Sequence, residues 1–322
     1  APPPLADIFL YIIFFPQLVS GPITRAGQFM PQIVPKRIAD VDYVEAAKWI
    51  VAGYFFKLFV ANNLNEMTSY MAFPLHETLR TQDRWLLVFL YSYQIYADFF
   101  GYSAIALGLG LLFGYRLPVN FNLPYVATSF SEFWTRWHIS LSTWFRDYLY
   151  IPLGGNRRGP ARNYANLVTV FFLCGLWHGA SWTFVIWGAF HGLLLVGARV
   201  FTKRKDPERP IDLRRDFVPM FVTFHLVAFG WIFFRADTLS NALDVIRGIV
   251  TFQGGETTVW VAAVPPLLAA TVAFDVLRRR MRVSGFAPLA SPRLAPLLVA
   301  VGVVALVVAS GAPPVQFVYF QF

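Results

Sequence analysis

The sequence is poor in cysteine and in charged residues, and each scarcity excludes a class of protein. Cys174 is the only cysteine among the 322 residues, so a disulfide within the chain, a cysteine-based zinc site and an iron–sulfur cluster are excluded. Charged residues make up 14% of the sequence, whereas soluble globular proteins carry roughly 25%. A large soluble catalytic domain is therefore excluded as well.

Hydrophobic residues, in contrast, are abundant. They make up 57% of the chain, and uncharged runs of membrane-spanning length recur along its whole length. This pattern predicts an all-α polytopic membrane protein in which residues 1–322 form a single multi-pass domain. The formal net charge is +9, and in a membrane protein such an excess marks cytoplasmic loops. Membrane lipid is therefore an expected partner, and nucleic acid is not.

The apolar runs predict seven or eight spanning elements. They cover residues 8–24, 44–61, 85–114, 163–198, 217–234, 257–274 and 295–310. Pro16 and Pro22 interrupt the first run, which predicts a span that continues into an irregular, re-entrant segment. Residues 85–114 suffice for one long tilted span or for two short ones.

Basic residues between the runs predict the topology. Residues 199–216 and 278–293 are rich in arginine and are predicted to be cytoplasmic, whereas residues 235–256 carry few basic residues and are predicted to lie outside. The arginines of residues 157–162 indicate another cytoplasmic segment. The uncharged run of residues 163–198 then begins and ends on the same face, so it is predicted to be a hairpin.

The apex of this hairpin carries the sequence GLWHGASW, residues 175–182. An arm of about 15 residues rises ~22 Å, less than the ~30 Å of the hydrocarbon core, so His178 is expected to be submerged. Ionisable groups at membrane depth are costly and tend to be functional. A histidine kept neutral by apolar surroundings accepts a proton, which makes His178 a candidate general base. A helix that restarts near Ser181 would direct free backbone N–H groups toward a developing negative charge.

Aromatic residues recur at three- and four-residue spacing over residues 130–148, which predicts an amphipathic helix. Ser129 and Glu132 form a capping-box pattern at its start, and Glu132 and Arg136 belong to its polar face. The helix is expected to lie at the cytoplasmic interface or to pack partly inside. His138 stands at the border of the aromatic stripe, where it is either a hydrogen-bonded packing residue or part of a site.

The remaining ionisable residues favour supporting roles. His191 lies inside the returning arm of the hairpin and is expected to orient a neighbour or to line a cavity. Asp98 is expected to pair with Arg116 or with a lysine of another span. A site of three histidines is conceivable, but no carboxylate stands at ligand spacing from them, so no metal is expected. Cys174 has no nearby cation in the sequence to activate it and is expected to pack.

Three ordered blocks of sequence carry a resemblance to a known family. They are FPQLVSGPI at residues 15–23, FWTRWHISLSTWFRDY at residues 133–148, and GLWHGA at residues 175–180, which His191-Gly192 follow. Together they closely resemble the membrane-bound O-acyltransferase family, and within it the alginate O-acetyltransferase branch. The resemblance implies a bundle with broken or re-entrant helices and an interfacial amphipathic helix. Because relatives have further spans before the first block, the chain resembles the C-terminal portion of a longer protein.

The resemblance also implies an activity. Members of the family move an acyl group from a thioester, acetyl-CoA or an acyl-phosphopantetheine carrier, to a hydroxyl that reaches the site from the opposite side. His178 matches the catalytic histidine of the family, His138 the second histidine, and His191 a further histidine. The expected process is O-acetylation of an alginate-like extracytoplasmic polysaccharide at a bacterial inner membrane, with a periplasmic acetyltransferase as partner protein. No permanently bound cofactor is expected.

Several assignments remain open at this point. Possible supporting residues of the site are Trp177, Ser181 and Asp98. Arg157, Arg158 and Arg162 either bind the phosphates of the donor or only anchor the topology. A polysaccharide, a teichoic acid and a serine of a partner protein are the candidate acceptors. Two other functions compete with acyl transfer: a transporter or channel, whose permeation path the broken hairpin would line, and a non-catalytic scaffold for a periplasmic acetyltransferase.

Overall fold

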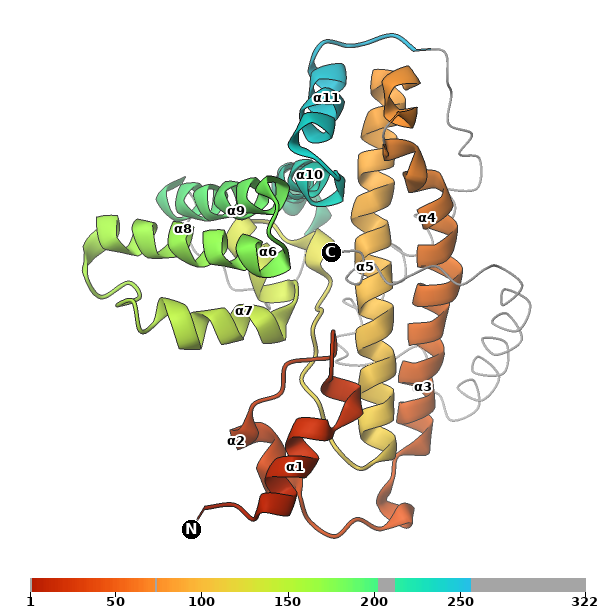
Figure 1. Cartoon of the computed structure of the whole chain (residues 1–322), viewed down its shortest axis with the longest axis vertical. Helices are drawn as coiled ribbons and strands as arrows, with labels where there is room; N and C mark the ends of the chain where they lie inside the picture. Colours follow the sequence, from red (N-terminus) through yellow and green to blue (C-terminus); the bar gives the residue numbers. More distant parts are fainter. Residues whose placement is uncertain (1, 73, 202–211, 256–322) are drawn as a thin grey trace. The chain divides into compact units, whose positions relative to one another are not determined.

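A computed structural model describes residues 2–72, 74–201 and 212–255, and the regular elements within these ranges are helices (Figure 1). The α-helices are α1 (Leu5–Ile13), α2 (Ala26–Phe29), α3 (Tyr43–Tyr54), α4 (Asn62–Thr68), α5 (Thr81–Leu112), α6 (Phe130–Arg136), α7 (Ile139–Phe145), α8 (Gly159–His178), α9 (Trp182–Phe201), α10 (Leu213–Arg235) and α11 (Leu239–Val250). The described residues divide into two compact units. Unit 1 contains residues 2–62 and 96–121, and unit 2 contains residues 63–95 without residue 73, 122–201 and 212–255.

Three of the described helices are long and apolar enough to cross a membrane. They are Thr81–Leu112, Trp182–Phe201 and Arg214–Arg235. The first is continuous over 32 residues, which decides between the one long span and the two short spans predicted for residues 85–114. At 1.5 Å per residue it is about 48 Å long, enough to cross a ~30 Å hydrocarbon core even when tilted.

Unit 1 begins with a helix that is much shorter than predicted. α1 has nine residues, which gives a length of about 13 Å, too little for a crossing. Pro16 then opens a single 3-10 turn over Phe15–Gln17. The helical part of the element predicted over residues 8–24 therefore ends at Ile13, and the predicted break at Pro16 is confirmed.

In unit 1, α3 packs closely on the second half of α5. Asp42 starts α3 by accepting a hydrogen bond from the Glu45 N–H at 2.9 Å, as an N-cap should. A Cβ at Gly53 would lie 2.6 Å from the Gly101 carbonyl oxygen, so only glycine permits this approach. α3 ends at Tyr54, and the chain continues directly as a π-helical segment, Phe55–Ala61.

This π-helical segment carries a buried ion pair. Lys57 Nζ pairs with Asp98 Oδ1 on α5, and both side chains are largely buried. The alternative that Asp98 pairs with a lysine of another span is therefore confirmed. Removing one member of such a pair leaves an uncompensated buried charge, which typically costs about 3–5 kcal/mol.

In unit 2, α8 and α9 form the predicted hairpin. The two helices run side by side (Figure 1) and are joined by residues 179–181. Gly175 faces the carbonyl of Phe184, and Gly188 faces the carbonyl of Phe171, so closely that neither position has room for a Cβ. Cys174 is buried in α8 with a free thiol, which confirms its packing role.

Two further helices complete the described part of unit 2. α10 covers residues 217–234, where a crossing is predicted, and is long and apolar enough for one. α11 begins where the Thr238 side chain accepts a hydrogen bond from the Asn241 N–H at 3.2 Å. Arg84 donates to the Asp244 carbonyl at 3.1 Å and so ties α11 to α5. The crossings predicted at residues 257–274 and 295–310, and the basic segment of residues 278–293, lie outside the described residues, as does most of the basic loop of residues 199–216.

Candidate active site

His138 lies at a break between two short helices. α6 ends before it and α7 begins after it, and His138 itself has the left-handed backbone conformation, with φ 41° and ψ 54°. The single helix predicted over residues 130–148 is therefore wrong at this point. A residue other than glycine pays about 1–3 kcal/mol for this conformation and keeps it only when the surrounding structure imposes it.

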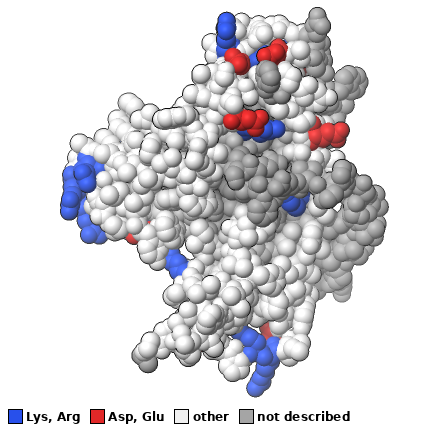
Figure 2. Space-filling model, viewed as in Figure 1, with Lys and Arg blue, Asp and Glu red and all other residues white. Residues whose placement is uncertain are grey.

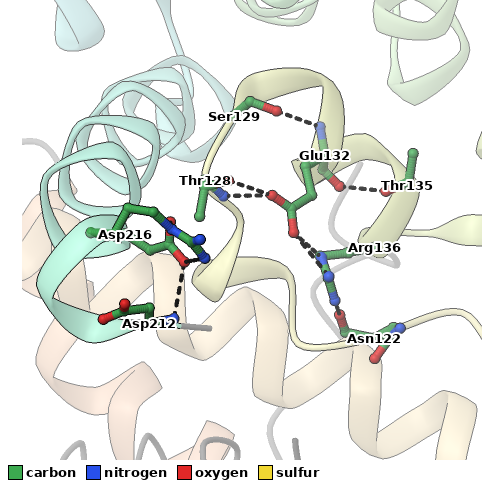
Figure 3. A network of polar contacts seen from close by, with 9 residues as sticks. Asn122, Thr128, Ser129, Glu132, Thr135, Arg136, Asp212 and Asp216 are labelled. Carbon is green, nitrogen blue, oxygen red and sulfur yellow. Dashed lines mark hydrogen bonds and ion pairs between the residues drawn. The ribbon is translucent and has the colours of Figure 1, made fainter. Parts of the chain in front are cut away.

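A buried ion pair at the end of α6 supplies this support (Figure 3). Glu132 Oε1 accepts from Arg136 Nε at 2.9 Å, and the N–H and hydroxyl of Thr128 both donate to Glu132 Oε2 at 2.8 Å. Arg136 also donates to the Asn122 carbonyl at 3.0 Å, and the Asn122 N–H donates to the Arg136 carbonyl at 2.9 Å. Hydrogen bonds to Glu132 and to Asn122 therefore hold Arg136, two residues before His138, in place.

The start of α6 differs in one respect from the predicted capping box. Ser129 Oγ accepts from the Glu132 N–H at 3.1 Å, which confirms the cap. The Glu132 carboxylate bonds to Thr128 and Arg136, where a capping box would have it return to the Ser129 N–H. Glu132 and Arg136 of the predicted polar face are buried, which confirms for α6 the alternative of a helix packed partly inside. The sequence pattern could not reveal a partner 14 residues away.

His178 is the last residue of α8, at the apex of the hairpin. Its half-buried ring packs against two aromatic side chains that also touch each other, with its centroid 5.1 Å from both the Trp187 and the Phe234 ring centroids. The next residue is Gly179, where a Cβ would lie only 2.7 Å from the Phe184 ring, so the packing leaves no room for a side chain at this position. The imidazole is therefore held by flat apolar surfaces from α9 and α10, a setting that favours the neutral ring.

The start of α9 lies three to four residues beyond His178. Ser181 Oγ accepts from the Thr183 N–H at 3.3 Å and lies 3.0 Å from Thr183 Oγ1. The Ser181 side chain thus caps one of the first N–H groups of this helix, as serine commonly does. Trp177, on the other side of His178, is largely exposed at 55% of its surface, and its ring lies 4.9 Å from that of His178.

His191 lies two turns inside α9 and is fully buried. Its ring centroid lies 4.7 Å from that of Trp187, 5.2 Å from that of Trp134 and 5.0 Å from that of Phe130. α10 passes it at Gly230, where a Cβ would lie 2.7 Å from His191 Nε2. Glycine at position 230 therefore makes room for the imidazole.

His138, His178 and His191 lie close enough in unit 2 for the charge of a protonated His178 to act on the other two. Burial lowers the pKa of His138 well below its usual range, and the charge of a protonated His178 lowers it further. Trp187 lies between the rings of His178 and His191, at 5.1 Å and 4.7 Å. In the described part of the chain, groups of three or more histidine, cysteine or acidic side chains placed to hold a metal ion are not found.

The candidate donor arginines lie on the connection between α7 and α8. Arg157, Arg158 and Arg162 are exposed, and Figure 2 shows basic side chains gathered over this connection, at the left of the view. Its backbone is anchored by Asn166, whose side-chain amide donates to the Gly155 carbonyl at 3.0 Å, and by the Tyr150 hydroxyl, which lies 2.6 Å from the side-chain carbonyl of Asn163. Asp98 belongs to unit 1, where it pairs with Lys57.

Sequence reasoning missed most of the aromatic surroundings of the histidines. Trp187 precedes His191 by four residues, so helical spacing could have placed the two rings on one face. Trp231 and Phe234 come from α10, and nothing local in the sequence relates that helix to His178 or His191. Only the packing of α10 on α9 brings them there.

Comparisons with known proteins place this arrangement in context. The sequence model of the membrane-bound O-acyltransferase family matches residues 1–233. The chain is 39% identical over 254 residues to a peptidoglycan O-acetyltransferase of Helicobacter pylori, which covers 77% of this chain and 47% of that protein. It is 41% identical over 248 residues to a probable alginate O-acetylase of Azotobacter vinelandii, with 77% and 48% covered.

A more distant relative is a teichoic acid D-alanyltransferase of Bacillus subtilis. The identity is 30% over 246 residues, which cover 72% of this chain and 61% of that protein. The chain spans about half the length of the first two relatives. Both His178 and His138 lie within the part of the chain that the family's sequence model matches.

Proposed function

This chain is a member of the membrane-bound O-acyltransferase family and a membrane protein, and on that premise we propose that it transfers an acyl group, in the first place acetyl, from a thioester to a hydroxyl of an extracytoplasmic polysaccharide. The relatives bear names that combine acyl transfer with peptidoglycan, alginate or teichoic acid. The stronger identity to the two O-acetylating relatives favours acetyl over D-alanyl as the transferred group.

The observation that carries the proposal is the position of His178. Its imidazole stands at the end of α8, half-buried against Trp187 and Phe234, at a break in the hairpin. A neutral imidazole held in such surroundings can act as a general base, and a positioned base contributes typically 10²- to 10⁴-fold in rate. His138 supports it as a positioning residue, since the strained break at the end of α6 holds that side chain within electrostatic range of His178.

The proposed step balances with groups that the substrates and His178 supply. His178 takes the proton of the acceptor hydroxyl while the oxygen attacks the thioester carbonyl carbon. The tetrahedral intermediate collapses, the C–S bond breaks, and the thiolate leaving group takes the proton back from His178. The products are the ester and the free thiol, and no oxidant or metal is required.

The donor, the partner and the location complete the proposal. Acetyl-CoA or an acyl-phosphopantetheine carrier is the donor, and the exposed Arg157, Arg158 and Arg162 are placed to meet its phosphates. The protein is proposed to be a multi-pass protein of a bacterial inner membrane, with a periplasmic acetyltransferase as partner. No role in the reaction is proposed for Asp98, because its ion pair with Lys57 already accounts for its burial.

The decisive experiment replaces His178 in the full-length protein. His178→Ala is expected to lower acetylation of the cell-envelope polysaccharide at least about 10²-fold, measured by mass analysis, while the amount of inserted protein stays the same. His225→Gln is the matched control, because His225 is a half-buried histidine of α10 whose Nδ1 lies 2.8 Å from the Phe221 carbonyl oxygen. Near-normal acetylation by His178→Ala would exclude His178 as the base.

The rival functions have their own outcomes in this experiment. A protein that moves solute across the membrane but gives no thioester-dependent acylation would be a transporter. A protein that binds a periplasmic acetyltransferase equally well with and without His178, again without acylation of its own, would be a scaffold.

The proposed topology is tested by labelling single cysteines in intact cells. In a Cys174→Ser background, an impermeant thiol reagent is expected to modify Ser240→Cys, which lies in the predicted outer segment, but not Arg162→Cys. Both positions are exposed, and both should react once the membrane is permeabilised. The reverse pattern in intact cells would contradict the topology.

A further inference from the structure

Three side chains of unit 2 that are less than 2% exposed, one of them in contact with His178, carry polar atoms that find no hydrogen-bond partner among the residues that the structure describes. They are Trp187, His191 and Trp231, at 1%, 0% and 1% of their surface exposed. The unpartnered atoms are both indole Nε1 atoms and both ring nitrogens of His191. More than nine in ten buried polar groups in native proteins are hydrogen-bonded, and an unmet one costs about 1–3 kcal/mol.

These side chains form one group, which we name the indole–imidazole cluster. The ring centroid of Trp187 lies 4.7 Å from that of His191 and 5.9 Å from that of Trp231, with the two indoles nearly parallel at 22°. The Trp231 and His191 centroids lie 6.2 Å apart. The cluster adjoins the proposed base, because the Trp187 and His178 centroids are 5.1 Å apart.

The chemistry of the cluster restricts what can bind to it. An indole N–H only donates, and a neutral imidazole offers one donor and one acceptor. The cluster therefore offers three donors and one acceptor, so a molecule that satisfies it must present acceptor oxygens for the donors and an N–H or O–H for the remaining imidazole nitrogen. A purely aliphatic acyl chain cannot do this, whereas the thioester end of a pantetheine arm can, because its thioester carbonyl is followed by amide groups along the same chain.

On the basis of the proposed function, we infer that the indole–imidazole cluster binds the carbonyl groups of the donor's acyl-pantetheine arm. Trp187, the member next to His178, donates its indole N–H to the thioester carbonyl. Trp231, one ring further along, donates to the nearest amide carbonyl, and His191 lies between them. The same arm occurs in acetyl-CoA and in a carrier protein, so the cluster serves either donor.

The test uses the arm itself, as S-acetyl-pantetheine and as pantetheine, which lacks the thioester carbonyl. Equilibrium dialysis measures the affinity of both probes for the purified full-length protein in detergent. Trp187 is replaced by benzothienylalanine, which keeps the ring shape and removes only the N–H donor, and Trp187→Phe is the simpler second variant. Trp144→Phe is the control, because Trp144 is 39% exposed and packs on Phe145 and Tyr148.

Removing the Trp187 N–H donor is expected to lower the affinity for S-acetyl-pantetheine about tenfold and to leave the affinity for pantetheine unchanged. The same replacement at Trp231 is expected to weaken both probes alike. Unchanged affinity of S-acetyl-pantetheine after the Trp187 replacement would overturn the inference, as would an equal loss for both probes, which would mean a structural role for the ring.

The failure of the inference is separate from the failure of the proposed function. If the unsubstituted protein transfers acetyl groups and binds S-acetyl-pantetheine, and the Trp187 replacement changes nothing, only the inference is wrong. If the unsubstituted protein neither binds the probe nor transfers acetyl groups, the proposed function is wrong, and the inference with it. Acetyl-CoA and an acetylated carrier protein, compared in the same assay, identify the physiological source of the arm.

Discussion

Two buried polar groups of unit 2 differ in how their hydrogen bonds are met. In the first, Glu132 and Arg136 bond to each other, to Thr128 and to the Asn122 carbonyl, at 2.8 to 3.0 Å (Figure 3). In the second, the indole–imidazole cluster, four ring nitrogens find no partner in the described ranges. Both groups lie in unit 2.

This difference indicates what each group is for. The Glu132–Arg136 pair is satisfied by the protein itself, so its bonds stabilise the backbone around His138. The indole–imidazole cluster leaves buried polar atoms unmet at a cost in free energy, which a bound molecule with matching polar groups would remove. Substitutions in the first group are therefore expected to change stability, and substitutions in the second to change ligand affinity.

The largest expected effect comes from breaking the satisfied pair. Arg136→Met leaves the Glu132 carboxylate buried with Thr128 as its one donor residue in the described ranges, which is expected to cost about 3–5 kcal/mol of the free energy of unfolding. Thermal unfolding of the purified protein in detergent measures the loss.

Two controls isolate the pair as the cause. The double variant Glu132→Gln with Arg136→Met removes both charges and is expected to recover most of the stability. Arg146→Met, which breaks the exposed pair of Arg146 and Asp147, is expected to change stability by less than about 1 kcal/mol. An Arg136→Met protein as stable as the unsubstituted protein would refute the structural role of the pair.

The next effect tests how tightly α10 packs against the indole–imidazole cluster. Gly230→Ala places a Cβ about 2.7 Å from His191 Nε2 and is expected to cost about 1–3 kcal/mol through overpacking. Gly197→Ala is the matched control, since no described atom lies within 4 Å of the added Cβ, and it is expected to stabilise α9 by up to about 1 kcal/mol.

A double-mutant cycle sharpens this prediction. If His191 is the residue that Gly230 accommodates, Gly230→Ala should cost much less in a His191→Ala background, because the clash is removed. Equal costs in both backgrounds, measured by thermal unfolding, would show that the glycine serves another contact.

The smallest expected effect concerns exposed charge. Reversing Arg157 and Arg158 to glutamate is expected to raise the apparent KM for acetyl-CoA roughly tenfold, with little change in turnover at saturating donor. Arg247→Glu is the control, because Arg247 is exposed on α11 within the segment predicted to lie outside. A donor KM that stays the same, with normal insertion, would leave these arginines with only a topological role.

Much of the helix layout could be predicted from the sequence. The hairpin of α8 and α9, its break after His178 and the long helices α5 and α10 all follow from uncharged runs and from glycine and proline positions, which are local properties of the chain. The Ser129 cap is likewise local, because it joins residues three positions apart.

The errors occurred where distant residues override a local pattern. Residues 130–148 have a helical period, yet the chain breaks at His138, where the Arg136 carbonyl accepts from the Asn122 N–H and the Arg136 side chain donates to the Asn122 carbonyl. The first apolar run is uncharged, yet α1 ends after nine residues. Hydrophobic periodicity and composition show which secondary structures a segment can form. Contacts with distant residues decide which of them it forms in the folded protein.

The sequence by itself determined the class of protein, the hairpin and the candidate base His178. Hydropathy, helix-breaking residues and the motif around His178 are local properties that can be found along the chain. Only the tertiary structure decided the surroundings of that base. Trp187 comes from α9, and Trp231 and Phe234 come from α10. Helix packing brings these side chains together, and their shared burial leaves ring nitrogens unbonded in the described part of unit 2. This group of side chains cannot be predicted from sequence spacing or composition, because it forms only when separate helices pack against one another.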